Sequence, residues 1–415
     1  MASTQADQGD FLSRHLPFLR STTRSIFVVL LIALSWRFLA FRNPDPQGYD
    51  ETVYCFYAQT LGEHGWHGLR EVVHAWPGNP VLNKAPLPYR LFFIVPGMWT
   101  CRLLGGYTVA NIALLSSLFG LAFIVVAWVL ARRWFGPALG MLVAITMIFS
   151  PLATALSNRA LQDTCFAFVV TACILLYDQC WRHSRKRDIW LFGLALLAGF
   201  LTKESMVVLY PSFVLAGICY ARRAGWRSKV PILIPFVLAP VLHIVIMSWL
   251  SGGLGECCRT YRAYAAQQGQ IPYALKYQSG PWFGYLVDFI LLSPLAVMFA
   301  AIGARYSSAD NDNAQGRSLA LIYLLTGLVT FSLLSLRNVR LVLFLEPYLL
   351  AFSILGIFSL GKRLFSNLRF QAVAVMLLLA LLVWSEIAQY TSIFVESGVY
   401  DPVTINLIHA AGFVH

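Results

Sequence analysis

Charged side chains are scarce in this sequence: Asp, Glu, Lys and Arg make up 12% of its 415 residues, about half their share in a soluble domain. Hydrophobic residues supply 58%. Apolar runs of about 17 to 25 residues recur along the whole length, and a hydrocarbon core about 30 Å thick needs about 20 residues of helix to cross it. The composition therefore excludes an ordinary soluble domain and indicates a membrane protein.

Cysteine patterns typical of zinc centres are also lacking, because the eight cysteines are scattered and no CxxC or Cys/His spacing occurs. Bases outnumber acids, 31 to 19, but they lie in short loops rather than on one continuous face, so we predict no nucleic-acid partner. A polar stretch rich in His and Glu matches no strong ligand spacing; it holds Glu63, His64, His67, Glu71 and His74. We predict no metal site and no required cofactor, with a divalent metal left as an unsupported alternative.

Eleven apolar segments are predicted to cross the membrane. They are approximately 25–41, 108–131, 136–157, 164–181, 189–202, 205–220, 230–250, 283–303, 318–335, 341–360 and 371–392. A further segment, 89–104, is ambiguous because it has 16 residues, Arg90 and Arg102 near its ends, and Pro96 in its middle.

Basic residues decide the topology through the positive-inside rule. If 89–104 does not cross and the N-terminus is cytoplasmic, 18 Lys and Arg residues fall in six short cytoplasmic segments and 12 on the outer side. If 89–104 crossed, the clusters RHSRKR (182–187) and RRAGWRSK (222–229) would face outward. We therefore predict an all-α integral membrane protein of about 11 transmembrane helices, with 89–104 as an interfacial or re-entrant helix.

This topology gives one transmembrane domain, 1–392, and a short extracytoplasmic tail, 393–415. Within the domain, the first outer loop (42–107) carries interfacial helices, and a second long outer loop covers 251–282. Loops of this length are usually functional.

Charged residues recur at the predicted outer ends of separate segments: the acids Asp50, Glu51 and Asp163, and the bases Lys84, Lys203, Arg337 and Arg340. Taken singly, such an acid is commonly a helix cap, and such a lysine commonly snorkels. As a set they indicate a site, because charges near hydrocarbon are costly and tend to pair or to line a functional cavity. Acids that accept a proton beside cations that hold a phosphate suit group transfer from a phosphate-activated donor.

The same residues carry a resemblance to a known family. In order, the chain has Asp50-Glu51 before a Tyr-containing amphipathic segment, Lys84-Ala85-Pro86-Leu87-Pro88-Tyr89, Ser150-Pro151 with Arg159 and Asp163, Leu201-Thr202-Lys203, GPWFGYLVDFILLSP, and Arg340 with Pro347. This order resembles the GT-C glycosyltransferases, in the branch of the protein O-mannosyltransferases and the lipid A aminoarabinose transferases. The resemblance extends from the first apolar segment to about residue 360.

The resemblance implies a GT-C fold, a polyprenyl-phosphate-linked sugar donor, and inverting transfer to an acceptor hydroxyl on the extracytoplasmic face. It implies Asp50 as general base, with Glu51 and Asp163 as further catalytic candidates. The donor phosphate would be held by cations from Lys84, Arg159, Lys203, Arg337 and Arg340. Asn83 stands where the aminoarabinose branch often has Glu, which weakens a carried-over metal site.

The acceptor cannot be inherited from either branch and could be a lipid, a glycan or a protein. Loop 251–282 is our candidate for acceptor contact, because aromatic faces stack on sugars; an interfacial aromatic belt is the alternative. Its tyrosines are Tyr261, Tyr264, Tyr273 and Tyr277. We expect a plasma membrane, the inner membrane if the cell is bacterial, with the N-terminus cytoplasmic and the C-terminus outside.

The rival function is a transporter or flippase for a lipid-linked or charged solute. Transporters commonly place ionisable residues near the midplane on broken helices, often in two related halves. In this sequence the acids and bases lie at segment ends on one predicted side, and no halves repeat. This arrangement favours the glycosyltransferase.

Overall fold

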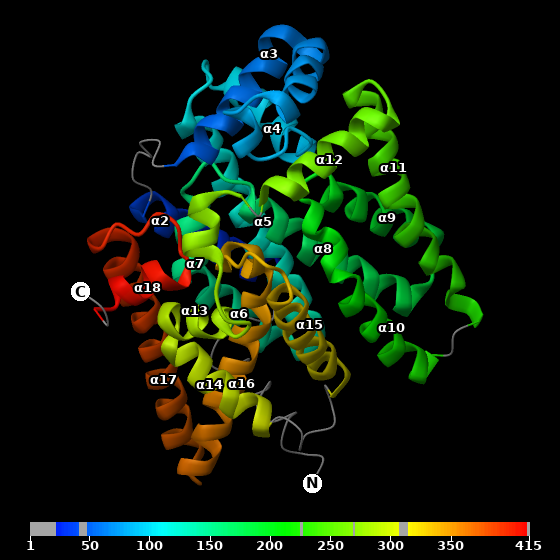
Figure 1. The fold of residues 1–415 in the computed structure, drawn as a ribbon. Coiled ribbons are helices and arrows are strands. Elements are labelled where there is room, and N and C mark those ends of the chain that lie inside the picture. Colours follow the sequence, from blue (N-terminus) through cyan, green and yellow to red (C-terminus); the bar gives the residue numbers. More distant parts are fainter. Residues whose placement is uncertain (1–21, 41–47, 225–226, 269, 307–313, 413–415) are drawn as a thin grey trace.

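The computed structural model describes residues 22–40, 48–224, 227–268, 270–306 and 314–412, and every element within these ranges is a helix (Figure 1). The α-helices are α2 (Thr22–Ala40), α3 (Tyr49–Ala75), α4 (Leu91–Leu103), α5 (Val109–Phe135), α6 (Pro137–Phe149), α7 (Pro151–Ser157), α8 (Asp163–His183), α9 (Lys186–Phe200), α10 (Tyr210–Ala224), α11 (Ile234–Ser251), α12 (Leu254–Gln268), α13 (Gly284–Leu292), α14 (Pro294–Tyr306), α15 (Ala314–Ser332), α16 (Glu346–Leu364), α17 (Leu368–Tyr390) and α18 (Thr404–Ala410). Shorter 3-10 or π turns are η2 (Trp76–Gly78), η3 (Leu82–Lys84), η4 (Glu204–Leu209), η5 (Arg227–Leu233), η6 (Ala274–Gln278), η9 (Val339–Leu345) and η10 (Thr391–Glu396).

Seven of the described helices are long and apolar enough to cross a bilayer, and two bent pairs raise that number to nine. These nine match nine of the eleven predicted segments. The other two, 25–41 and 189–202, form α2 and α9, whose apolar lengths fall short of a full span; α9 has 15 residues. The all-helical membrane fold is therefore confirmed, whereas the count of eleven crossings is not.

The ambiguous segment 89–104 forms α4, which has 13 residues. At 1.5 Å per residue this helix is about 20 Å long, too short for a hydrocarbon core of about 30 Å. Its first turn is tied to the α9–η4 connection, because the amide of Phe92 donates to the carbonyl of Leu201 at 3.0 Å. The length agrees with an interfacial or re-entrant helix.

Both bent pairs break at a Ser-Pro step. The axis turns by 59° between α6 and α7, and by 114° between α13 and α14. Proline cannot donate the helical hydrogen bond but suits the first position of a new helix. At the first break, the hydroxyl of Ser150 accepts from the amide of Ala153 at 3.1 Å and caps α7. The second break turns α13 across the end of the bundle, where it packs against α18.

Glycine allows the backbones of α14 and α16 to touch. A side chain at Gly303 would collide with the carbonyl of Phe352, and one at Gly356 would collide with the carbonyl of Phe299. Small residues at such crossings allow the close approach that helix packing in membranes favours. The second of these helices, α16, follows directly on η9, the turn that carries Arg340.

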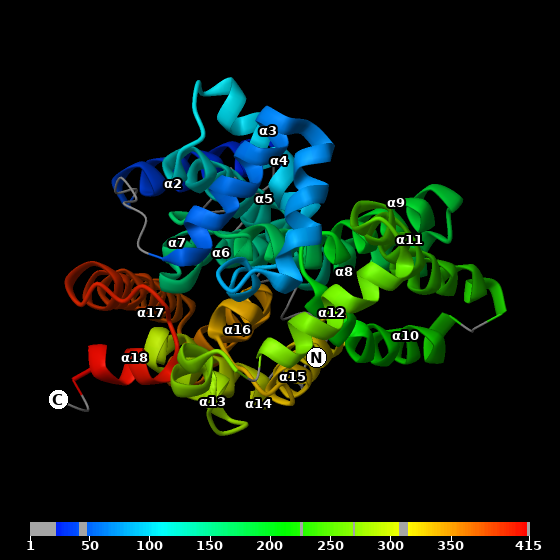
Figure 2. The same ribbon diagram turned by 45° about the horizontal axis from the view of Figure 1, so that its top comes forward.

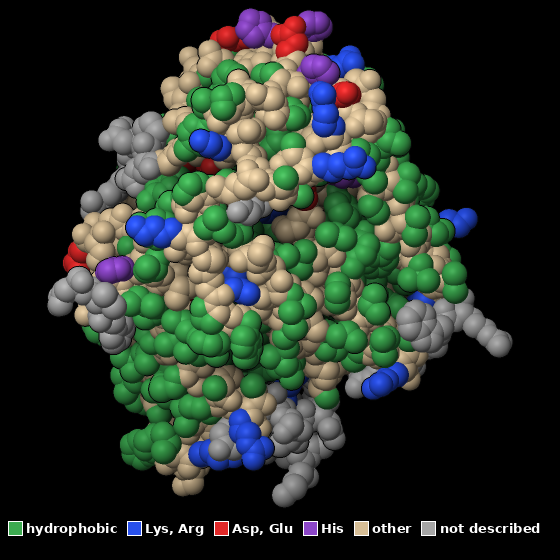
Figure 3. Space-filling view, in the orientation of Figure 1, with side chains coloured by type: hydrophobic (Ala, Val, Ile, Leu, Met, Phe, Trp, Pro, Cys, Tyr) green, Lys and Arg blue, Asp and Glu red, His purple; other side chains and the backbone are tan. Residues whose placement is uncertain are grey.

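The two ends of the bundle differ in charge. Figure 1 places α3, α4 and α12 at one end, which we call the α3 end, while α16 and α17 extend to the other. In Figure 2, α13 and α18 lie together beside α17. In the space-filling view, His and acidic side chains gather at the tip of the α3 end, basic side chains lie near both ends, and hydrophobic side chains dominate the face between them (Figure 3).

Candidate active site

The predicted acidic pair lies in the first turn of α3, where negative charge is favoured by the helix dipole. The two neighbours have different surroundings. Glu51 is 1% exposed and its Oε1 accepts from the amide of Ala160 at 3.0 Å, which ties α3 to the loop before α8. The structure thus places Glu51 as a support for that loop rather than as a group open to a substrate.

Asp50 is partly exposed and forms no hydrogen bond or ion pair with any residue that the structure describes. Burial raises the pKa of the Asp50 carboxyl above its ordinary value, while Arg340 and Arg90 act in the opposite direction. Asp163 and Asp401 are also within electrostatic reach. Among the described residues, Asp50 is therefore a carboxylate without a direct partner, surrounded by charged groups from distant parts of the chain.

Asp163 begins α8 and forms an ion pair with Lys203, with 2.8 Å between the Nζ and Oδ1 atoms. Both side chains are largely buried, at 6% and 11% exposed. Lys203 reaches this position because its residue is extended between α9 and η4, and its Nζ lies 5.7 Å from the centre of the Phe166 ring. Two predicted site residues are thus brought together.

Arg340 lies in η9 and pairs with an acid that the sequence reasoning missed. Its Nε is 3.3 Å from Oδ1 of Asp401, in the C-terminal tail. Asn338 Nδ2 donates to the same oxygen at 2.7 Å, and Tyr273 Oη donates to Oδ2 at 2.8 Å. Asp401 follows the last apolar segment and matches no periodic pattern or motif in the sequence.

Arg90 is a second missed residue; in the sequence it served only to mark the end of an ambiguous segment. Its side chain is buried, its Nη2 lies 3.5 Å from Glu204 Oε2, and its Nη1 donates to the Tyr54 hydroxyl. Burial of a full positive charge at the start of α4 is costly unless the charge is paired, as it is here. The sequence did offer one indication that Arg90 belongs to the site, because Arg90 ends the NKAPLPYR motif that also holds Lys84.

Three predicted phosphate ligands do not join this cluster directly. Lys84 is exposed in η3, and within the described ranges it has no ion pair. Arg337 donates to the carbonyl of Ser332 at 3.1 Å and to that of Gly280. Arg159 lies 4.2 Å from the centre of the Tyr400 ring and donates to the carbonyl of Val399 at 3.3 Å.

The four tyrosines of the second long loop divide into two pairs. Tyr261 bonds His243 Nε2 at 2.8 Å, and Tyr264 packs against Trp76 with 6.2 Å between ring centres. Tyr273 bonds Asp401, and Tyr277 stacks on Tyr273 at 4.8 Å. The loop therefore borders the charged cluster on two sides and leaves Tyr273 partly exposed.

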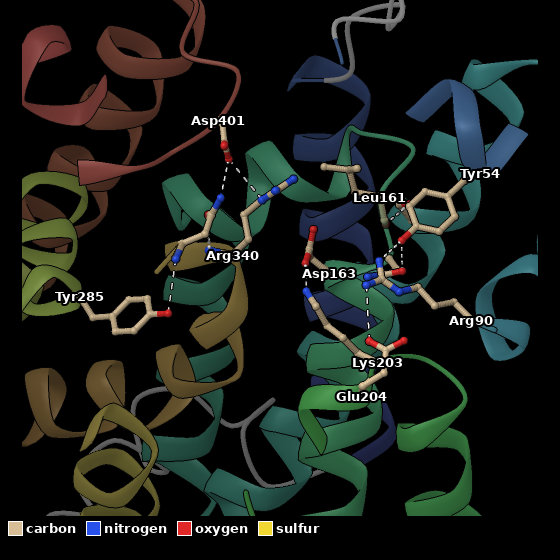
Figure 4. Close-up of polar contacts among 12 residues, drawn as sticks. Tyr54, Arg90, Leu161, Asp163, Lys203, Glu204, Tyr285, Arg340 and Asp401 are labelled. Carbon is tan, nitrogen blue, oxygen red and sulfur yellow. Dashed lines mark hydrogen bonds and ion pairs between the residues drawn. The ribbon is translucent and has the colours of Figure 1, made fainter. Parts of the chain in front are cut away.

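Seen together, the charged groups face one another across a gap (Figure 4). Arg340 and Asp401 lie on one side, and Asp163 with Lys203, and Arg90 with Glu204, lie on the other. A recess below the α3 end opens onto acidic and basic side chains in the space-filling view (Figure 3). Across the described ranges, no three His, Cys, Asp or Glu side chains come together to hold a metal ion.

Residues 97–249 match the family described as dolichyl-phosphate-mannose-protein mannosyltransferase. No match was found among curated proteins. The matched part includes Arg159, Asp163 and Lys203 but neither Asp50 nor Arg340.

The fold matches solved glycosyltransferases over nearly the whole chain. ArnT from Cupriavidus metallidurans, bound to undecaprenyl phosphate, is 15% identical; the match covers 95% of this chain and 79% of that one, with a TM-score of 0.58. The oligosaccharyltransferase AglB from Archaeoglobus fulgidus, in complex with an inhibitory peptide and a dolichol-phosphate, is 12% identical, with 91% and 56% covered and a TM-score of 0.59. This chain thus spans a little over half of AglB. The predicted resemblance is confirmed: the chain has the GT-C fold and is similar to the protein mannosyltransferase and ArnT branch of that superfamily.

Proposed function

We propose that this protein is a membrane glycosyltransferase that moves a sugar from a polyprenyl-phosphate donor to an acceptor hydroxyl on the extracytoplasmic face. The observation that carries the proposal is the unpaired carboxylate of Asp50, set among Arg340, Arg90 and the Asp163–Lys203 pair. The fold match to two proteins solved with polyprenyl phosphates supports it.

The reaction follows from these groups. Asp50 accepts the proton of the acceptor hydroxyl as that oxygen attacks the anomeric carbon of the donor sugar. The bond between this carbon and the phosphate oxygen breaks, and polyprenyl phosphate leaves with one additional negative charge. A single displacement inverts the configuration at the sugar carbon.

The cations stabilise the leaving group. Arg340 and Lys203 lie on opposite sides of the gap, so they can hold the phosphate from two directions as its charge grows (Figure 4). Asp163 keeps Lys203 in place through their 2.8 Å ion pair. Lys84 and Arg159 lie further out in this scheme, and Arg337 supports the backbone around η9.

The same geometry favours an enzyme over a transporter. The acids Asp50 and Asp163 lie at helix ends, where α3 and α8 begin, rather than midway along broken helices. The proposal includes an orientation and a location. The N-terminus lies in the cytoplasm, the C-terminus lies outside, and the protein is in a plasma membrane.

The test is sugar transfer from labelled polyprenyl-phosphate sugars by purified protein in vesicles. We expect Asp50→Asn to lower kcat by at least about 100-fold, because general-base catalysis contributes on this order. Glu63→Gln is the matched control, since Glu63 is an exposed acid on the same helix that contacts Gln59. Full transfer by the Asp50→Asn variant would remove the assigned base.

A further inference from the structure

The C-terminal tail forms part of the site wall. Val399 and Tyr400 contact Arg159 through a carbonyl and a ring face, and the next residue, Asp401, reaches Arg340. Tyr400 also packs against Gly48 so closely that a side chain at Gly48 would collide with its hydroxyl. Residues 399–401 thus connect the start of α3, the loop before α8, and η9.

Asp401 is held by donors on both of its oxygens. Oδ1 receives Asn338 Nδ2 and faces Arg340 Nε, while Oδ2 receives the Tyr273 hydroxyl and lies 3.4 Å from Gln278 Nε2. Asp401 is 5% exposed. A carboxylate so enclosed and so well bonded is poorly placed to exchange a proton with a substrate, so its effect must pass through the groups that it contacts.

Arg340 is bound to Asp401 at one edge only. The pair uses Nε, and no residue in the described ranges hydrogen-bonds either Nη atom. In Figure 4 the guanidinium points across the gap toward the side that carries Asp163. A guanidinium offers a planar set of donors that suits two phosphate oxygens at once. If the tail served to keep a phosphate out of the gap, it would contact the Nη edge of Arg340. Asp401 instead contacts Nε and leaves the Nη edge open.

We propose that Asp401 is a positioning residue, which fixes the Nε edge of Arg340 so that its Nη edge faces the phosphate of the donor and of the leaving group. This inference rests on the proposed function, because it assumes that a polyprenyl phosphate occupies the gap. It assigns a role in donor recognition to the tail, which lies outside residues 97–249 and outside every motif of the sequence.

The test measures binding of undecaprenyl phosphate and the KM and kcat of sugar transfer. In Asp401→Asn and Asp401→Ala we expect binding of undecaprenyl phosphate to weaken and the donor KM to rise by about 10- to 100-fold, the range typical of a misplaced clamp. The alanine variant should lose more, because asparagine keeps one acceptor oxygen for Nε. The change in kcat should be smaller than the change in KM.

Three further variants, compared with Arg340→Ala, separate positioning from general destabilisation. Arg340→Ala combined with Asp401→Ala should bind undecaprenyl phosphate no more weakly than Arg340→Ala alone, because Asp401 acts through Arg340. Glu396→Ala, an exposed acid of the same tail, should leave binding unchanged. Thermal unfolding in detergent shows which variants remain folded, and Tyr273→Phe, which removes one bond to Asp401, should give a smaller shift in the same direction.

The outcomes are distinct. If the wild-type protein transfers sugar but Asp401→Asn binds undecaprenyl phosphate as tightly as the wild type or more tightly, the positioning role is overturned and the proposed function stands. Additive effects in the double variant would also overturn it. If the wild-type protein neither binds undecaprenyl phosphate nor transfers sugar, the proposed function fails, and the role of Asp401 fails with it.

Discussion

The Nζ of Lys203 lies 2.8 Å from the carboxylate of Asp163, forty residues earlier in the chain, and this contact joins the turn after α9 to the start of α8. Both side chains are nearly buried. The pair is thus a structural connection as well as part of the proposed phosphate site, and the two roles can be measured separately.

Loss of either partner should destabilise the protein. Lys203→Met leaves Asp163 as a buried charge without its cation, and we expect a loss of about 3–5 kcal/mol in unfolding free energy. Asp163→Asn should have a similar effect. The double variant Asp163→Asn/Lys203→Met should recover much of this stability but no sugar transfer, as measured by unfolding in detergent and by activity. Equal stability of single and double variants would contradict the pairing.

The pH dependence of transfer should report on Asp50. Burial raises the pKa of Asp50 above the ordinary pKa of Asp, which is about 3.9. The carboxylate therefore becomes protonated at a higher pH than an ordinary Asp. A protonated base cannot accept the acceptor proton, so kcat/KM should fall as pH falls through this raised pKa and level off above it. Removing the opposing charge in Arg340→Gln should move the acid limb to still higher pH. An acid limb at the same pH in Arg340→Gln and in the wild type would show that Arg340 does not influence the pKa of Asp50.

A native cysteine tests the orientation. Cys258 is exposed on α12, at the α3 end, next to the buried Cys257. A membrane-impermeant maleimide applied to the outside of intact cells should label the wild-type protein and not Cys258→Ser. Lys362→Cys, at the far end of α16 and made in the Cys258→Ser background, should react only after permeabilisation. The opposite pattern would place the site in the cytoplasm.

The contact between α14 and α16 should tolerate no added side chain. Gly303→Ala would force a methyl group against the carbonyl of Phe352, and we expect a loss of about 1–3 kcal/mol, seen as a lower unfolding temperature. Gly255→Ala on α12 is the control, because open space surrounds that position. A loss of equal size in both variants would point to general effects of helix substitution.

Much of this arrangement could be predicted from the sequence. The spacing of apolar runs gave the helices, and the distribution of Lys and Arg led us to treat 89–104 as a non-crossing segment, consistent with the 13 residues of α4. That choice brought Asp50, Asp163, Lys203 and Arg340 to one predicted side. In the structure, Asp163 and Arg340 each lie within electrostatic reach of the other three residues.

Other parts of the site depend on tertiary contacts that no local pattern records. Asp50 and Glu51 are adjacent, but neighbouring residues on a helix point in directions about 100° apart, so one faces the gap while the other supports a loop. Asp401 needs η9 and the second outer loop to be in place before its role is visible. Lys84 matched a motif, yet η3 leaves its side chain exposed.

The ion pairs of the site have a consequence for how the protein assembles. Lys203, Arg340 and Arg90 each take their counter-ion from a different hydrophobic segment or connection than their own: Asp163, Asp401 and Glu204. The α8–α9 hairpin can pair Lys203 with Asp163 by itself, whereas Arg340 and Arg90 need partners from segments outside their own hairpins. A bundle that has not finished packing carries unpaired charge beside lipid, which costs free energy. The charged cluster is thus complete only when the C-terminal tail and the α9–η4 connection have packed against the rest of the bundle.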